Sequence, residues 1–271
     1  MKALVGLLMA VILSCQKKSD ASPPAPVEAA HRVAPDWQRF ADLSYEVIKE
    51  FPHDTGAFTQ GLYLSKDCWI EGTGGFGQTS IRRVEKKTGR VLLQKNLAPE
   101  YFGEGIAELN GKLYQLTWKN QIGFVYDAKT FQWQKNFAYA GEGWGLTTDG
   151  THLIMSNGSD RLRFLDPNSF RVVKEIAVRH KGNAMTQLNE LEFIEGEIFA
   201  NVWMRDEILR INAADGSVLG VIDLRGIDAR ETRKNHDFVL NGIAYDATMG
   251  DLFVTGKCWP KIYQIRLVAN K

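Results

Sequence analysis

A unit of roughly 40 to 50 residues recurs along this chain and limits its possible folds more than any other feature. Each unit opens with a short apolar run and continues with further short runs separated by Gly, Asn and Asp turn signals. The units start at residues 61, 105, 145, 191 and 242, which are 44, 40, 46 and 51 residues apart. Repeats of this length with about four short strands each are typical of β-propeller blades. We therefore predict an all-β fold, a five-bladed β-propeller, in preference to an open sandwich or two stacked sheets.

The fifth unit lacks an outer strand, because the chain ends four residues after Leu267. A segment with strand character, residues 45–51 (YEVIKEF), precedes the first unit and belongs to no unit of its own. A closed ring leaves no strand edge exposed. We therefore expect this N-terminal strand to close the last blade.

The N-terminal residues 1–14 have the pattern of a lipoprotein-type signal peptide. Lys2 precedes the apolar run Ala3–Leu13, which is too short to span a bilayer. The run ends in Ile-Leu-Ser-Cys, which resembles the lipobox in which the cysteine becomes the lipidated first residue. We expect Cys15 to be lipidated and the protein to be exported and anchored in a bacterial cell envelope, on the periplasmic side. A plain secretory signal with an incidental cysteine is the alternative.

Residues 15–36 are predicted to be a disordered linker, because they hold four of the eight prolines and almost no large apolar side chains. The single propeller domain is expected to occupy residues 37–271. No later apolar run approaches the ~18 residues of a transmembrane helix, so the lipid is the only membrane attachment expected.

Composition excludes several classes of function. Lys and Arg number 33 against 32 Asp and Glu, and this balance removes the electrostatic case for nucleic-acid binding. The five histidines are scattered without metal-ligand spacing, so neither a metal nor another cofactor is expected.

Cys68 and Cys258 should lie toward opposite faces of neighbouring blades, and both are expected to be free thiols.

Side chains suited to a binding pocket gather at corresponding positions of the units. The first strand of a blade lines the central channel, so residues just before it, and those at the end of the second strand, should meet at the channel mouth. These residues are Phe58, Gln60, Phe102, Glu104, Trp144 and Asn189 before first strands, and Trp118, Trp203 and Lys257 after second strands. Taken singly, the tryptophans could be inter-blade core, Glu104 a solvated loop residue and Lys257 a surface residue. Glu71 is either a second channel carboxylate or a structural hydrogen-bonding group.

The order of the stretches around these residues resembles the plant and bacterial type of glutaminyl-peptide cyclotransferase (glutaminyl cyclase), a five-bladed propeller. The stretches are FPHDTGAFTQGLYL (51–64), YFGEGIAELNGKLYQLTW (101–118), GEGWGLTTDG (141–150), LIMSNGSDRLRFLDP (153–167), LNELEFIEGEIFANVW (188–203), LNGIAYD (240–246) and VTGKCWP (254–260). The resemblance covers nearly all of residues 44–268. It implies that peptides or proteins with an N-terminal glutamine are converted to pyroglutamate with release of ammonia.

By this resemblance Glu104 is the general acid/base. Gln60, Asn189 and Lys257 are then expected to bind the substrate amide or the developing oxyanion, and the five aromatic residues to form the pocket walls. The protein is expected to act as a monomer. Two other functions stay open at this point: a non-catalytic, lipid-anchored propeller that binds a peptide or carbohydrate, and a metal-dependent, lactonase-like propeller.

Overall fold

Strands make up almost every element of the computed structural model, which describes residues 36–228 and 235–270. The one helical element in this part of the chain is η1 (Asp36–Arg39), a single 3-10 turn. Within the same residues no helix is both long and apolar enough to cross a membrane. The predicted signal peptide, the lipidated Cys15 and nearly all of the linker lie outside the described residues.

Three of the sheets are four-stranded and antiparallel, with their strands in sequence order. The first contains β2 (Thr59–Ser65), β3 (Cys68–Thr73), β4 (Ser80–Glu85) and β5 (Val91–Asn96). The second contains β6 (Gly103–Leu109), β7 (Lys112–Thr117), β8 (Ile122–Asp127) and β9 (Trp133–Ala138). The third contains β10 (Leu146–Thr148), β11 (Leu153–Met155), β12 (Arg161–Leu165) and β13 (Val172–Ala177). A small hairpin of β14 (Arg179–His180) and β15 (Asn183–Ala184) follows.

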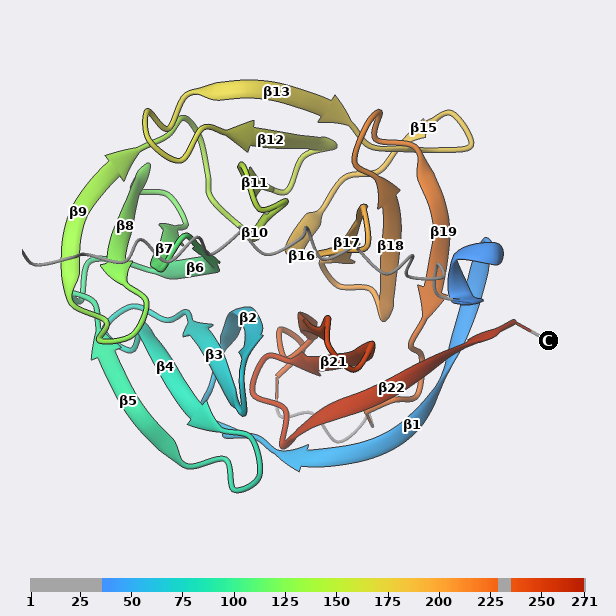
Figure 1. Cartoon of the computed structure of the whole chain (residues 1–271), viewed down its shortest axis with the longest axis horizontal. Helices are drawn as coiled ribbons and strands as arrows, with labels where there is room; N and C mark the ends of the chain where they lie inside the picture. Colours follow the sequence, from blue (N-terminus) through green and yellow to red (C-terminus); the bar gives the residue numbers. More distant parts are fainter. Residues whose placement is uncertain (1–35, 229–234, 271) are drawn as a thin grey trace, which may run out of the picture. The chain divides into compact units, whose positions relative to one another are not determined.

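The last two repeat units share one eight-stranded sheet. Its strands are β16 (Leu188–Ile194), β17 (Glu197–Val202), β18 (Glu207–Asn212), β19 (Val218–Asp223), β20 (Leu240–Asp246), β21 (Asp251–Gly256), β22 (Lys261–Ala269) and β1 (Asp42–Pro52). Strand β1 runs antiparallel to β22, from Leu43 opposite Ala269 to Pro52 opposite Lys261. At its start it also pairs with β19 in parallel. Residues 45–51 therefore lie beside β22, where the missing outer strand was expected (Figure 1).

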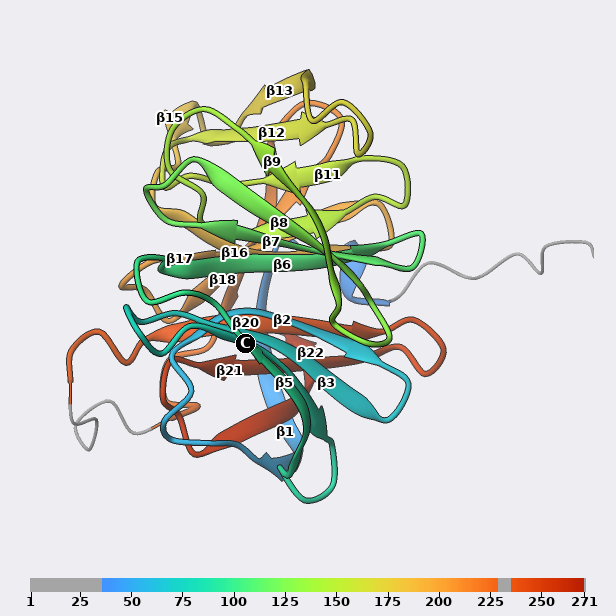
Figure 2. The same cartoon turned by 90° about the vertical axis from the view of Figure 1, so that its left-hand side faces the viewer.

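The sheets are arranged around a common axis, as in a β-propeller (Figure 1). The first strands of successive units contact one another around this axis. In the side view these inner strands run nearly straight, whereas outer strands such as β5 and β9 are steeply inclined to them (Figure 2), as the right-handed twist of a sheet requires. The buried apolar clusters draw their residues from neighbouring sheets, such as Ile154 of the third and Ile198 of the fourth unit.

Glycines allow the first strands to approach each other closely. A Cβ atom on Gly61 would lie 2.6 Å from the backbone nitrogen of Ile106, and one on Gly145 would lie 2.0 Å from the carbonyl oxygen of Asn189. The fourth unit has Glu190 at the equivalent position. Its buried carboxylate accepts hydrogen bonds from the backbone nitrogens of Leu62 (3.3 Å) and Ile243 (2.9 Å). Glu190 thus joins the inner strands of three units at the axis.

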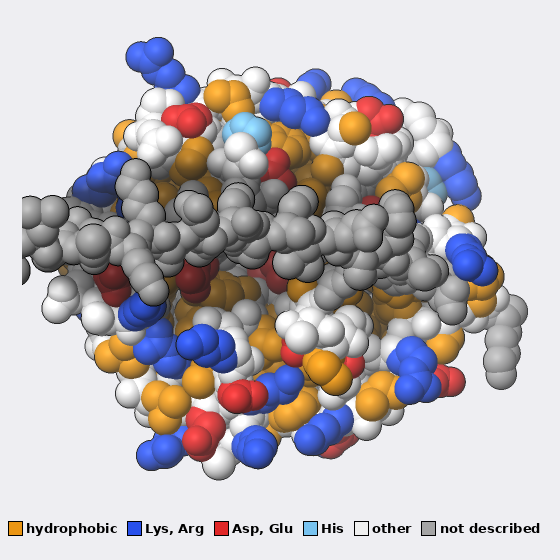
Figure 3. Space-filling model, viewed as in Figure 1, with side chains coloured by type: hydrophobic (Ala, Val, Ile, Leu, Met, Phe, Trp, Pro, Cys, Tyr) orange, Lys and Arg blue, Asp and Glu red, His pale blue; other side chains and the backbone are white. Residues whose placement is uncertain are grey.

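On the face seen in Figure 3, basic and acidic side chains are interspersed over the described residues.

Cys68 and Cys258 are free thiols, which confirms the expectation from the sequence.

Candidate functional site

A cavity of about 460 Å³ opens where first strands begin and second strands end. All nine of the side chains chosen from the sequence line it: Phe58, Gln60, Phe102, Glu104, Trp118, Trp144, Asn189, Trp203 and Lys257. Gln187 and Asp237 line it as well, and the sequence analysis did not select them. The volume suits a small ligand, and an apolar lining with a few convergent polar groups is typical of ligand sites.

The repeat explains why these side chains meet. In an antiparallel pair the beginning of one strand lies beside the end of the next. Gln60, Glu104 and Asn189 stand at the beginnings of β2, β6 and β16, whereas Lys257 follows the last residue of β21. The same edge of several sheets therefore places its polar side chains in one cavity.

Glu104 is 4% exposed, and its carboxylate accepts a hydrogen bond from Gln60 Nε2 at 3.0 Å. The orientation of the Gln60 amide is fixed, because its Oε1 accepts a hydrogen bond from Asn241 Nδ2 at 3.0 Å. Burial raises the pKa of Glu104 well above the usual value; the positive charge of Lys257 opposes this, and the negative charge of Glu142 adds to it. A carboxyl group in this setting can hold a proton near neutral pH.

Lys257 is buried in the same cavity. Burial lowers the pKa of its ammonium group, and the charge of Glu104 partly restores it. Its Nζ lies 4.7 Å from the centre of the Phe58 ring, a cation–π contact. Lys257 and Glu104 line the same cavity, and within the described residues they form no direct ion pair.

Asn189 offers an unused acceptor. The side chain is 3% exposed, and its Oδ1 has no hydrogen-bond partner among the described residues. A buried amide oxygen without a partner carries a desolvation cost that a ligand N–H can remove. Asn189 lines the cavity, whereas its unpaired Oδ1 is itself buried.

Aromatic rings form most of the cavity wall. Phe102 contacts Phe58 and Trp118 edge to face, with ring centres 6.1 Å and 5.7 Å apart. Trp144 contacts Trp203 in the same way at 6.0 Å. These rings exclude water from the space beside Glu104 and so contribute to the rise of its pKa.

Glu142 touches this wall and was missed by the sequence analysis. Its Oε2 accepts hydrogen bonds from Trp118 Nε1 at 2.8 Å and from Trp144 Nε1 at 2.9 Å. The residue stands two positions before Trp144, inside a stretch that the family resemblance had already marked. That proximity was the available signal.

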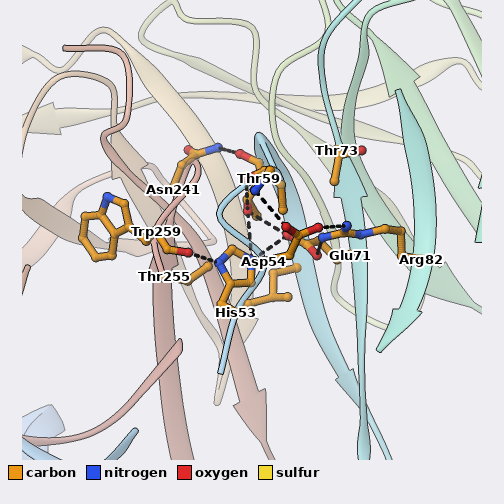
Figure 4. Close-up of polar contacts among 12 residues, drawn as sticks. His53, Asp54, Thr59, Glu71, Thr73, Arg82, Asn241, Thr255 and Trp259 are labelled. Atoms are coloured by element: carbon orange, nitrogen blue, oxygen red, sulfur yellow. Dashed lines mark hydrogen bonds and ion pairs between the residues drawn. The ribbon is translucent and has the colours of Figure 1, made fainter. Parts of the chain in front are cut away.

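Glu71 belongs to a separate buried cluster beside the cavity (Figure 4). Its carboxylate is held by His53 Nε2 at 2.9 Å, Thr59 Oγ1 at 2.7 Å and Arg82 Nη2 at 2.6 Å. Arg82 also pairs with Asp54 at 2.7 Å. Burial alone would raise the pKa of Glu71, but the charges and hydrogen bonds of His53 and Arg82 lower it to about 2. Of the two roles considered for Glu71, these contacts fit the structural one.

The imidazole of His53 lies between two acceptors in this cluster. Its Nδ1 lies 2.6 Å from the carbonyl oxygen of Trp259, and its Nε2 faces Glu71. Both partners are acceptors, so the imidazole bonds both only when both nitrogens carry protons. Burial would lower the pKa of His53, but the charge of Glu71 and these hydrogen bonds raise it overall. The cluster thereby ties the segment after β1 to the loop that follows Lys257 (Figure 4).

A cavity of about 210 Å³ is lined by Glu192, whose pKa burial raises to about 8, but none of the nine side chains chosen from the sequence lines it. Two further cavities, of about 390 and 540 Å³, adjoin η1. Among their lining residues the buried charged groups are Arg210 and Glu197, which pair with each other at 2.8 Å. The cavity around Glu104 gathers all nine of the chosen side chains and is therefore the candidate active site.

Comparisons with known proteins point to one kind of protein. The family model described as glutamine cyclotransferase matches residues 13–267. A curated glutaminyl-peptide cyclotransferase from Arabidopsis thaliana is 44% identical over 235 residues, which covers 83% of this chain and 73% of the relative. The crystal structure of Myxococcus xanthus glutaminyl cyclase matches with a TM-score of 0.81 and 34% identity, covering 86% of this chain and 100% of that one.

Proposed function

The chain belongs to the glutamine cyclotransferase family and is a glutaminyl-peptide cyclotransferase, and we propose that its reaction takes place in the cavity around Glu104. The substrates are peptides or proteins with an N-terminal glutamine. The products are the pyroglutamyl peptide and ammonia.

One observation carries the assignment of Glu104 as the general acid/base. It is a buried carboxyl group with a raised pKa that lines the cavity, and within the described residues its one hydrogen bond comes from Gln60. Acid/base catalysis is most effective when the pKa of the group lies near the working pH. Glu71 is equally buried, but its pKa of about 2 makes it a weak proton acceptor, and three side chains of the protein already bond its two oxygens.

The reaction closes a five-membered ring. The neutral α-amine attacks the side-chain carbonyl carbon, a C–N bond forms, and the carbonyl oxygen becomes an oxyanion. Glu104 accepts a proton from the attacking amine and passes it to the departing nitrogen, which leaves as ammonia while the carbonyl re-forms. Because both reacting groups belong to one residue, a pocket that fixes its rotamer removes much of the entropic barrier.

Three polar residues complete the site in this proposal. The Lys257 ammonium stabilises the oxyanion in the cavity that it shares with Glu104. The side-chain amide of Asn189, which lines the cavity, binds the substrate amide. Gln60 keeps the Glu104 carboxyl group in place through its 3.0 Å hydrogen bond.

We also propose a five-bladed ring closed by β1, with β20, β21, β22 and β1 as the fifth blade. The pairing of β1 with β22 supports this closure, and so does the edge contact of Phe51 at the end of β1 with Trp69 and Phe253. Removal of residues 1–51 should lower the melting temperature or the solubility, because it exposes β22 as an edge strand. A truncated protein that melts like the full chain would contradict closure by β1.

The predicted export and lipid anchor are retained as a proposal, as is the monomeric state. The sequence around Cys15 supports anchoring to the bacterial envelope. Replacing Cys15 by alanine should move the protein from the membrane fraction to the soluble periplasmic fraction. Light scattering of the folded domain should give the mass of one chain.

The direct test of function is incubation with a Gln-initiated dipeptide while ammonia is measured. The wild-type protein should release ammonia, and Glu104→Gln should bind the dipeptide but release little. Binding without ammonia release by the wild-type protein would favour the non-catalytic alternative.

A further inference from the structure

We infer that Glu142 is a positioning residue of this site, whose carboxylate holds the two halves of the aromatic wall in one arrangement around the substrate. The inference rests on the proposed function of the cavity. Glu142 would act through Trp118 and Trp144, without contacting the reacting atoms.

The geometry of the two indoles carries the inference. Trp118 follows β7 and Trp144 precedes β10, so the two indoles come from different repeat units. Both Nε1 atoms donate to the same oxygen of Glu142, at 2.8 Å and 2.9 Å. An indole N–H is a donor only, so its acceptor determines how the ring is turned. One carboxylate oxygen thus sets the rotation of both rings.

The backbone next to these rings is already fixed. Gly143 N donates to the carbonyl oxygen of Trp118 at 3.0 Å, and Trp144 N donates to that of Ser156 at 3.1 Å. The remaining freedom lies in the side-chain torsions of the two tryptophans. Those torsions are what Glu142 restrains.

The ring contacts leave a gap that Glu142 fills. Phe58, Phe102 and Trp118 form one connected group, and Trp144 with Trp203 forms another. Within the described chain no ring contact joins Trp118 to Trp144. The Glu142 carboxylate is therefore the junction between the two groups.

Lys119 supports the junction from the protein surface. Its Nζ lies 3.9 Å from Glu142 Oε1 and 3.9 Å from the centre of the Trp118 ring. The negative charge of Glu142 also adds to the raised pKa of Glu104. Glu142 therefore has two separable roles. Its carboxylate oxygen orients the two indole rings, and its negative charge adds to the raised pKa of Glu104.

Two substitutions separate these properties. Glu142→Gln keeps an oxygen that can accept from both indoles but removes the charge. We expect its KM to stay within about twofold of wild type, since the acceptor is retained. The acidic limb of its pH–rate profile should move to lower pH, because Glu104 loses a neighbour that raises its pKa.

Glu142→Ala removes both the charge and the acceptor, and two partly buried N–H groups lose their partner. We expect KM for the Gln-initiated dipeptide to rise about tenfold, with a smaller change in kcat. The matched control is Glu175→Ala. Glu175 lies on the outer strand β13, and its carboxylate pairs with Arg163 of β12. This substitution should leave KM unchanged.

A double-mutant cycle decides whether Glu142 acts through the indoles. In a Trp118→Phe/Trp144→Phe background no indole N–H remains at either position, so Glu142→Ala should change KM by less than about twofold further. An equal tenfold cost in both backgrounds would overturn the inference, and so would an unchanged KM for Glu142→Ala alone. A tenfold rise for Glu142→Gln would overturn it as well, and this isosteric variant keeps the test valid if the alanine variant folds poorly.

The same assay separates failure of this inference from failure of the proposed function. If Glu104→Gln stays fully active, the acid/base assignment fails, whereas the KM effects at Glu142 still report on the walls. If Glu104→Gln is inactive and the Glu142 variants behave like wild type, only the inference about Glu142 fails.

Discussion

Two buried glutamates on neighbouring sheets, Glu71 and Glu104, show how surroundings determine what a carboxyl group does. They are 1% and 4% exposed. Glu71 is enclosed by His53, Thr59 and Arg82, and its pKa falls to about 2. Glu104 faces an aromatic cavity with one amide donor, and its pKa rises well above the usual value. Burial acts in the same direction on both, so the number of positive charges and donors decides the outcome.

This difference assigns different work to the two residues. A carboxylate with paired charges and several hydrogen bonds stabilises the fold and is chemically silent. A desolvated carboxyl group with one donor can exchange a proton with a ligand. Substitutions that remove one member of each arrangement test this difference.

The largest effect is expected for Glu104→Gln, which keeps the size of the side chain but removes the titratable group. Loss of a general acid/base typically lowers the rate about 10²–10⁴-fold, or about 3–5 kcal/mol of barrier. The loss should appear in kcat more than in KM, because the walls, Asn189 and Lys257 remain. Steady-state kinetics with the Gln-initiated dipeptide measure both parameters. A rate within about threefold of wild type would show that another group moves the proton.

Glu71→Gln should act on stability instead. Removing one partner from a buried ion pair costs about 3–5 kcal/mol, because His53 loses its carboxylate partner and Arg82 keeps only Asp54. Urea unfolding should show this loss, whereas kcat of the folded enzyme should change far less than in Glu104→Gln. If Glu71→Gln abolished activity with unchanged stability, the roles of the two glutamates would have to be exchanged.

Lys257→Met tests the second charged group of the cavity. Removing a group that stabilises an oxyanion costs about 10²–10³-fold in kcat. The same substitution removes the charge that opposes the raised pKa of Glu104, so the acidic limb of the pH–rate profile should move to higher pH. A lower rate with an unmoved limb would mean that Lys257 and Glu104 are not electrostatically coupled.

The smallest effect is expected in the pH dependence of stability. The pKa of His53 is raised in the folded state, so its contribution is complete below the unfolded value of ~6.5 and is lost as pH rises through the folded pKa. The pKa of Glu71 is lowered, so its contribution is present above ~4.3 and is lost as pH falls toward about 2. Urea unfolding across this range should show the alkaline decline in wild type and a weaker one in His53→Gln. Equal slopes of stability against pH in wild type and His53→Gln would show that His53 does not contribute to this pH dependence.

The repeat made most of the fold and the cavity lining predictable. Once the units are aligned, the residues before Gly61 and Gly105 fall at one edge of the sheets, and this alignment brought Gln60 and Glu104 together. The position of residues 45–51 beside β22 followed from the outer strand missing from the fifth unit.

Contacts between residues far apart in the sequence could not be predicted from the repeat. Nothing local to Glu71 indicates that His53 and Arg82 bond it. The hydrogen bonds of Glu142 to two tryptophans, and of Glu190 to two neighbouring inner strands, likewise depend on how separate units meet. Sequence spacing places a residue at an edge, but the residues across that edge determine its charge and its partners.

The most direct test of this account is a titration of the two glutamates by carboxyl-carbon NMR in glutamate-labelled protein. Glu104→Gln and Glu71→Gln each remove one resonance and so assign the signals. The account predicts that the Glu104 signal titrates well above the usual glutamate range, whereas the Glu71 signal remains that of a carboxylate to the lowest pH at which the protein is folded. Titration of both residues near ~4.3, or a lower pKa for Glu104 than for Glu71, would contradict it.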